Sequence, residues 1–358
     1  GEAPASIAVT ARGSSNLPLK LAAVWTLLIA YGSLYPFSGW QATGVDPLAF
    51  LMAGWPRYFT AFDLAANLLA YLPLGFFWTA ALIRRLAPIL ALGLALLIGA
   101  GLSLGVEIVQ NYLPSRVPSN LDFACNTVGA LLGAILGLAG GRALLDGGRL
   151  HRWRAQHFLA GAHGDAGLML VALWLLGQLD PASLPFGNGN LRSLIGLPTA
   201  FEFEANRIRN FELATVAAQT LAVALIGARL ARRHPFMFPV GLILLALLVK
   251  SVALTVLMQG IGGLAWATPG TLAGLALGLL MWGSAMALPA GARQAIAAIS
   301  LMLATVLANL MPDNPYLEDS LRVWQQGHFL NFNGLTRLVS ASWPFLALPW
   351  LMLSRSER

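Results

Sequence analysis

The sequence predicts an all-α integral membrane protein that crosses the bilayer about ten times. Hydrophobic residues make up 57% of its 358 positions and charged residues 10%, whereas about 25% of the residues of a typical soluble domain are charged. The apolar residues also occur in runs of about 20, which is the length that an α-helix needs to cross the hydrocarbon core of a membrane.

Ten such runs follow one another, separated by polar, proline-containing or basic segments. We expect the spans at residues 18–37, 61–83, 88–112, 121–141, 166–180, 209–230, 236–260, 267–288, 292–311 and 336–353. The fifth run is short for a membrane-crossing helix. An even number of spans places both termini on the same side of the membrane.

The distribution of charge predicts which side that is. Fourteen basic and four acidic residues fall on the face that carries the termini, whereas seven basic and eleven acidic residues fall on the other. Basic residues are retained in short cytoplasmic loops, so both termini are predicted to be cytoplasmic. Because the basic residues are spread over many loops, no nucleic acid partner is expected. Membrane lipids are the expected partners of these loops.

The chain divides into four predicted parts. Residues 1–17 form a small, polar, disordered tail, and residues 18–141 form a membrane domain of four helices. Residues 142–165 form a cytoplasmic linker, and residues 166–358 a second membrane domain of about six helices. The outer loop 181–208 contains "FEFEANRIRNF", which predicts either a short strand or an interfacial helix.

Two weak internal similarities leave open whether the second domain repeats the first. "FDLAANLLAYL" from Phe62 resembles "FELATVAAQTL" from Phe211, and "LDFACNTVGAL" from Leu121 resembles "LNFNGLTRLVS" from Leu330. The two offsets are 149 and 209 positions. A repeat with these offsets requires an extra pair of helices in the second half.

Polar side chains gather near the predicted outer ends of three spans in the first domain. Residues four apart share one helix face, and this spacing relates Asp63, Asn67 and Tyr71 in the second span. Glu107 and Gln110 lie near the end of the third span. Asp122 and Asn126 lie near the start of the fourth, above a ladder of glycines that favours close helix packing.

Ionisable groups inside a membrane are costly, at about 3 kcal/mol each on insertion scales, so they face one another or a wet cavity. Arg116, on the loop "LPSRVP", can swing over these acids, and Arg57 precedes the second span on the same side; both are predicted to bind an anionic group. The simpler alternative is an ion pair between Arg116 and Glu107 or Asp122 that fixes the loop.

Lys250 is a basic residue in the interior of a span of the second domain. Because its side chain would have to stretch to reach water, we expect it to have a partner. The candidates are Glu212 and the acids of residues 313–319, and a substrate-binding role for Lys250 is an equal alternative.

Residues 60–140 resemble the VanZ-like family of membrane proteins. The matching pattern is Asp63, Asn67 and "YLPLGF", followed by ExxQ from Glu107, "LPSR" ending at Arg116, and DxxxNxxG from Asp122. This resemblance implies a compact domain at the outer face of the bacterial cytoplasmic membrane and a link to glycopeptide (teicoplanin) resistance. It also implies that the shared polar residues form the site, namely Asp63, Asn67, Glu107, Gln110, Arg116, Asp122 and Asn126.

The sequence is compatible with three functions. The first is binding, with or without transport, of a lipid-linked envelope precursor such as a polyprenyl phosphate or a glycolipid. The second is an outer-leaflet enzyme of glycosyl or phosphoryl chemistry, with Glu107, Asp122 and Asp63 as catalytic carboxylates or as oxygen ligands of Mg²⁺ or Ca²⁺. The third is a proton-coupled transporter or a scaffold without a substrate. No organic cofactor is expected in any of them.

Overall fold

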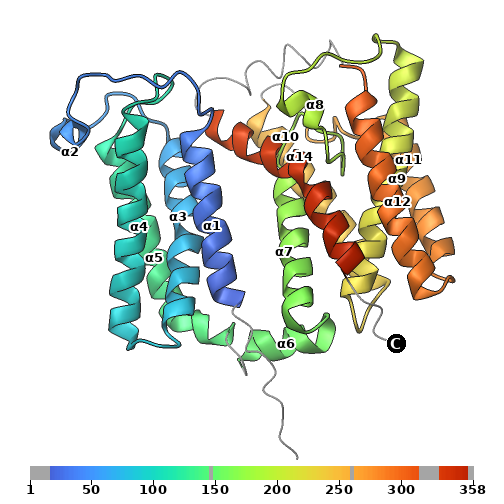
Figure 1. Cartoon of the computed structure of the whole chain (residues 1–358), viewed down its shortest axis with the longest axis horizontal. Helices are drawn as coiled ribbons and strands as arrows, with labels where there is room; N and C mark the ends of the chain where they lie inside the picture. The colour runs from blue at the N-terminus through green and yellow to red at the C-terminus, as the bar shows by residue number, and fades with distance from the viewer. Residues whose placement is uncertain (1–16, 145–147, 259–261, 314–329, 354–358) are drawn as a thin grey trace, which may run out of the picture.

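The structure is a computed structural model that describes residues 17–144, 148–258, 262–313 and 330–353 (Figure 1). No strand occurs among these residues, so the predicted all-α class is confirmed. The ten long helices are α1 (Leu17–Leu34), α3 (Ala61–Leu82), α4 (Pro88–Gln110), α5 (Asn120–Gly140), α7 (Gly161–Gly177), α9 (Ala205–Leu230), α10 (Met237–Leu257), α11 (Pro269–Ala285), α12 (Ala290–Leu310) and α14 (Leu330–Leu353). The short ones are α2 (Ala49–Met52), α6 (Arg149–His157), α8 (Leu191–Leu194) and the 3₁₀ helix η1 (Gly141–Ala143).

Each predicted span overlaps one of the long helices. Seven of the described helices, α1, α3, α4, α5, α9, α10 and α12, are long and apolar enough to cross a membrane. Helices α7 and α11 are apolar but have 17 residues each, and α14 contains Pro344 and Pro349. A span count of ten therefore stays a prediction beyond these seven helices.

Helices α1, α3, α4 and α5 form the first bundle, and its tightest contact joins α3 to α5. A Cβ atom added to Gly133 would lie 1.9 Å from the carbonyl oxygen of Leu72, and one added to Gly129 would lie 2.3 Å from that of Leu68. No side chain fits at these two positions, so the predicted glycine ladder does allow a close helix approach. Its partner is α3.

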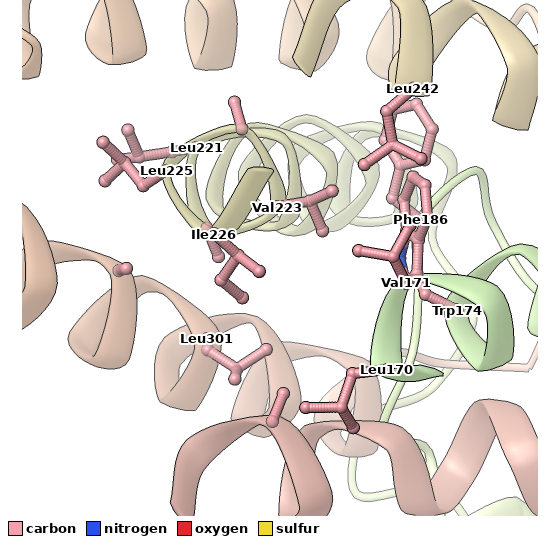
Figure 2. Close-up of a cluster of buried hydrophobic side chains, with 14 of the residues drawn as sticks. Leu170, Val171, Trp174, Phe186, Leu221, Val223, Leu225, Ile226, Leu242 and Leu301 are labelled. Atoms are coloured by element: carbon pink, nitrogen blue, oxygen red, sulfur yellow. The ribbon is translucent and has the colours of Figure 1, made fainter. Parts of the chain in front are cut away.

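Helix α9 lies at the centre of the second bundle. Within its most apolar window, 72% of the residues are buried inside the protein. It packs against α7, α10, α11 and α12. Figure 2 shows Ile226 of α9 pointing toward Leu301 of α12, and Val223 of α9 pointing toward Val171 and Trp174 of α7. Polar side chains on α9 are therefore shielded from lipid.

The pairing of α9 with α11 resembles the pairing of α3 with α5. A Cβ atom on Gly278 would lie 2.7 Å from the carbonyl oxygen of Ala217, and both residues follow Gly129 and Leu68 by the same 149 positions. The similarity between Phe62 and Phe211 fits this offset. The expected correspondence of Leu121 with Leu330 does not, because α11 rather than α14 packs on α9.

The two bundles are joined at the end of the molecule where α6 lies (Figure 1). Arg154 of α6 forms an ion pair with Asp165 of α7, and both side chains are buried. Lys20 of α1 lies 4.0 Å from the same carboxylate. The described part of the predicted linker 142–165 is largely helical, and its last residues already belong to α7.

At the opposite end, α14 reaches the first bundle, where Gly334 packs against the ring of Tyr35. Both the start of α1 and the end of α14 lie toward the α6 end (Figure 1). The cytoplasmic location of that end stays a prediction, and the predicted tail falls, apart from Leu17, outside the described residues.

The segment "FEFEANRIRNF" forms no strand, and its residues from Ala205 onward are helical. Residues 201–204 have no regular structure, and α9 begins at Ala205 and continues into the apolar run. Most of the other predicted outer segment, 312–335, lies at 314–329, outside the described residues.

Candidate functional site

The first bundle carries a polar cluster at the end opposite α6. Asn67 Nδ2 donates to Asp122 Oδ1 at 2.8 Å, which joins α3 to α5. Asp63 closes the first turn of α3, where its Oδ2 accepts from Thr60 N at 2.9 Å while Thr60 Oγ1 accepts from Asp63 N at 3.1 Å. This reciprocal capping box satisfies two helix-end groups, and it places the Asp63 carboxylate close to that of Asp122.

Below these acids, buried amides and hydroxyls connect neighbouring helices. Asn126 Nδ2 donates to Ser103 Oγ at 3.0 Å, linking α5 to α4. Gln110 Nε2 donates to the carbonyl oxygen of Ser33 at 2.8 Å, linking α4 to the end of α1. Tyr71 is 2% exposed, and its hydroxyl lies near Ser103. These contacts hold the four helices in register.

Glu107 is 2% exposed and binds the loop that precedes α5. Its Oε2 accepts from the backbone N–H of Ser119 at 2.8 Å, and Ser119 Oγ in turn caps α5 by accepting from Asp122 N at 3.2 Å. The carboxylates of Glu107 and Asp122 interact electrostatically. The structure therefore brings the three predicted carboxylates together, although their role in binding or catalysis stays a prediction.

Arg116 contacts the loop after α1 rather than the acids of this cluster. The guanidinium of Arg116 donates through Nη2 to the carbonyl oxygen of Tyr35, and among the described residues no ion pair with Glu107 or Asp122 forms. Burial lowers the pKa of Arg116 to about 10, so it stays charged at neutral pH. Arg57 is exposed on the preceding loop. Arg116 thus binds a backbone oxygen instead of the acids, while the predicted binding of an anionic group by Arg116 and Arg57 stays a prediction.

Lys250 has a different partner from those expected. Its Nζ donates to the carbonyl oxygen of Asp180 at 2.5 Å and to Ser183 Oγ at 3.0 Å, and the residue is 1% exposed. The carboxylate of Glu212 accepts a hydrogen bond from Thr268, and Asp313 pairs with Arg192. The acids within residues 314–319 lie outside the described residues.

A cavity of about 720 Å³ lies beside Lys250, at the same end of the molecule as α2 and α8 (Figure 1). Its lining comes from the loop after α7, from α8, and from helices α9, α10, α12 and α14, together with the loop before α11. A volume of about 300–1,000 Å³ is typical of small-molecule sites.

The charged groups of this cavity are only partly satisfied by protein. Arg192 and Asp313 form an ion pair at 2.8 Å. Arg337 uses Nη2 to donate to Ser193 O at 2.6 Å, which leaves its other nitrogens as further donors. An ammonium carries three N–H donors, and Lys250 uses two of them. Lys250 and Arg337 therefore retain donors that a ligand in the cavity can accept.

Sequence reasoning placed Lys250 in the site but missed most of the cavity. Asp180, Ser183, Arg192 and Arg337 come from segments that are far apart in the chain, and their contacts run largely to backbone oxygens. Backbone acceptors leave no mark in a residue pattern. A proline-rich loop, "DPASLPFGNGN" at 180–190, was the signal available.

Fold and site together define a multi-pass α-helical membrane protein with polar groups concentrated at one end. The family model for VanZ/LLP1 matches residues 17–140, so this part of the chain forms a VanZ/LLP1 domain and the remainder is a C-terminal extension. The match covers α1 to α5, which contain the whole polar cluster. The searches of curated proteins and of solved structures found no significant match to this chain.

Proposed function

We propose that the protein binds the headgroup of a lipid-linked envelope precursor, of the polyprenyl phosphate or glycolipid type, at the outer face of the bacterial cytoplasmic membrane. The observation that carries this proposal is the Lys250 cavity. Two cations with spare donors, Lys250 and Arg337, line a space of about 720 Å³. Phosphate oxygens accept charge-assisted hydrogen bonds from such groups.

The VanZ/LLP1 domain supports the same location for a different reason. Its carboxylates and amides lie at the same end of the molecule as the cavity, but they mainly cap helices and bond to one another. We therefore assign binding to the cavity and a positioning role to the polar cluster. No contact among the described residues favours the enzyme or the proton-coupled transporter.

The test is native mass spectrometry of the purified full chain with a short polyprenyl phosphate, using phosphatidylcholine as the competing neutral lipid. We expect Lys250→Met to reduce phosphate-lipid binding about tenfold or more, because a charged hydrogen bond is lost. Lys20→Met, at the opposite end, serves as the matched control. Arg116→Ala should bind normally, since its guanidinium serves the Tyr35 carbonyl. Loss of binding in Arg116→Ala with Lys250→Met unaffected would place the site in the first bundle and contradict the proposal.

A further inference from the structure

Helices α7–α11 correspond in their order and contacts to helices α1–α5. Helix α1 ends in "GSLYP" at 32–36 and α7 ends in "GQLDP" at 177–181, an offset of 145 positions. In each bundle a side chain two helices later donates to a carbonyl oxygen of this segment: Gln110 to Ser33, and Lys250 to Asp180. Together with the shared glycine contacts, this indicates that α7–α11 repeat the arrangement of α1–α5.

The caps of α5 and α11 follow the same correspondence. Ser119 Oγ accepts from Asp122 N at 3.2 Å, and Thr268 Oγ1 accepts from Thr271 N at 3.1 Å. Thr268 follows Ser119 by 149 positions, and Thr271 follows Asp122 by the same number. The same offset places Glu212 of α9 where α3 has Asp63. Glu212 is therefore the acid of the second bundle at the place that an acid of the polar cluster occupies in the first.

The surroundings of the two acids differ. Asp63 caps α3, whereas α9 begins at Ala205, about two turns before Glu212, so Glu212 has no helix end to cap. At the 149-position offset, Val216 and Thr271 take the places of Asn67 and Asp122, which pair with each other in the first bundle. The second bundle thus lacks the side chains that fill this part of the first.

Glu212 faces the cavity with one oxygen in use. Its Oε2 accepts from Thr268 Oγ1 at 2.7 Å, and within the described part of the chain its Oε1 has no hydrogen-bond donor. Glu212, Thr268 and Trp266 line the cavity on the side of α9 and α11, while Lys250 and Arg337 line it from α10 and α14. A carboxylate oxygen accepts hydrogen bonds only, so a matching ligand must offer a donor such as a hydroxyl group.

We infer that Glu212 is a specificity-determining residue of the Lys250 cavity, which selects headgroups that carry sugar hydroxyls beside the phosphate. This inference rests on the proposed function and adds the class of headgroup. A fully ionised bare phosphate has no hydroxyl group that could donate to Glu212. The nearby Glu212 carboxylate also repels the negative charge of the phosphate. A glycosylated phosphate satisfies both sides of the cavity at once.

The test compares two probes on the purified full chain: a short polyprenyl phosphate and the same lipid carrying one hexose on its phosphate. In the Glu212→Gln variant the amide oxygen can still accept from Thr268 while the charge is removed, so the fold is retained; a thermal melt checks this. Glu204→Gln, an exposed acid next to the start of α9, is the matched control. We expect Glu212→Gln to weaken binding of the glycosylated lipid about tenfold or more and to strengthen binding of the bare phosphate lipid, because the repelling charge is removed.

The other possible results separate failure of this inference from failure of the proposed function. If Glu212→Gln leaves both lipids unaffected, or weakens both equally, Glu212 does not select the headgroup and the inference is overturned while the proposed function stands. If the unmodified protein binds neither lipid above phosphatidylcholine, both are overturned. If the unmodified protein prefers the bare phosphate lipid, the cavity does not recognise sugar and the inference fails on that ground. Glu212→Asp, which shortens the side chain and keeps the charge, should recover part of the preference.

Discussion

Asn67 Nδ2 donates to Asp122 Oδ1 at 2.8 Å, and this bond ties together the ends of α3 and α5 that lie opposite α6. The residues are 55 positions apart in the chain and belong to helices whose backbones touch through glycine. The polar contact and the glycine contact fix the same helix pair at different depths. Substitutions that remove either contact should therefore lower the stability of the protein.

Replacing Asn67 by Ala should destabilise the protein by about 1 kcal/mol, because a hydrogen bond to a charged acceptor is lost at a half-buried site. The measurement is unfolding of the purified protein in mixed micelles as the denaturing detergent increases. Asn111→Ala is the matched control, since its amide bonds to Thr43 at an exposed position of the same face. Equal effects of the two substitutions would show that the Asn67 bond contributes nothing specific.

Replacing Gly133 by Ala should cost about 2 kcal/mol or more, because the added Cβ meets the Leu72 carbonyl and must push α3 and α5 apart. Gly105→Ala in α4 has nothing within 4 Å of the new atom, and it should be neutral or stabilising, since Ala favours helix. Thermal melts of the two variants in the same detergent measure the difference. A Gly133→Ala protein as stable as Gly105→Ala would mean that the helices are not in backbone contact.

Replacing Asp165 by Asn should cost about 3 kcal/mol or more, because it leaves the buried Arg154 without its charged partner. The double variant Arg154→Met with Asp165→Leu should recover much of this loss, since an apolar pair of similar volume packs without a desolvation cost. Lys20→Met should have a small effect, because Lys20 is 41% exposed and lies 4.0 Å from the carboxylate. Additive losses in the double variant would contradict a direct ion pair.

The orientation can be measured with single cysteines in a Cys125→Ser background. Arg57→Cys and Arg85→Cys place thiols at exposed loop positions of opposite ends of the first bundle. In intact cells, a membrane-impermeant maleimide should label the first and reach the second only after permeabilisation, as the cytoplasmic excess of basic residues predicts. The reverse pattern would place the cavity on the cytoplasmic side and remove the basis for the proposed function.

The sequence was informative about helices because a span leaves a long, contiguous record of apolar residues. All ten apolar runs overlap helices, while α2, α6 and α8 were missed because segments of four to nine residues are too short for a periodic pattern to distinguish them from a loop. The helix face shared by Asp63 and Asn67 could be read from a spacing of four. The bond from Arg116 to Tyr35 could not, because any residue presents the same carbonyl oxygen.

The second bundle was harder to read for a related reason. Its similarity to the first lies in helix order, in caps and in glycine contacts, whereas few residues of the polar cluster are repeated. The offset of 149 was visible at Phe62 and Phe211, but a second correspondence was sought at α14 rather than at α11. Recognising which helix packs on α9 required coordinates.

The position of α9 also bears on how the chain is made. During synthesis α9 enters the bilayer before α11 and α12, the helices that later surround it. Until α11 arrives, Thr220, which lies against Gly278 of α11 and is fully buried in the finished protein, would face lipid tails. Because polar groups are costly in hydrocarbon, this half of the protein must be held by the insertion machinery or by α7 and α10 until the ribosome has delivered the rest.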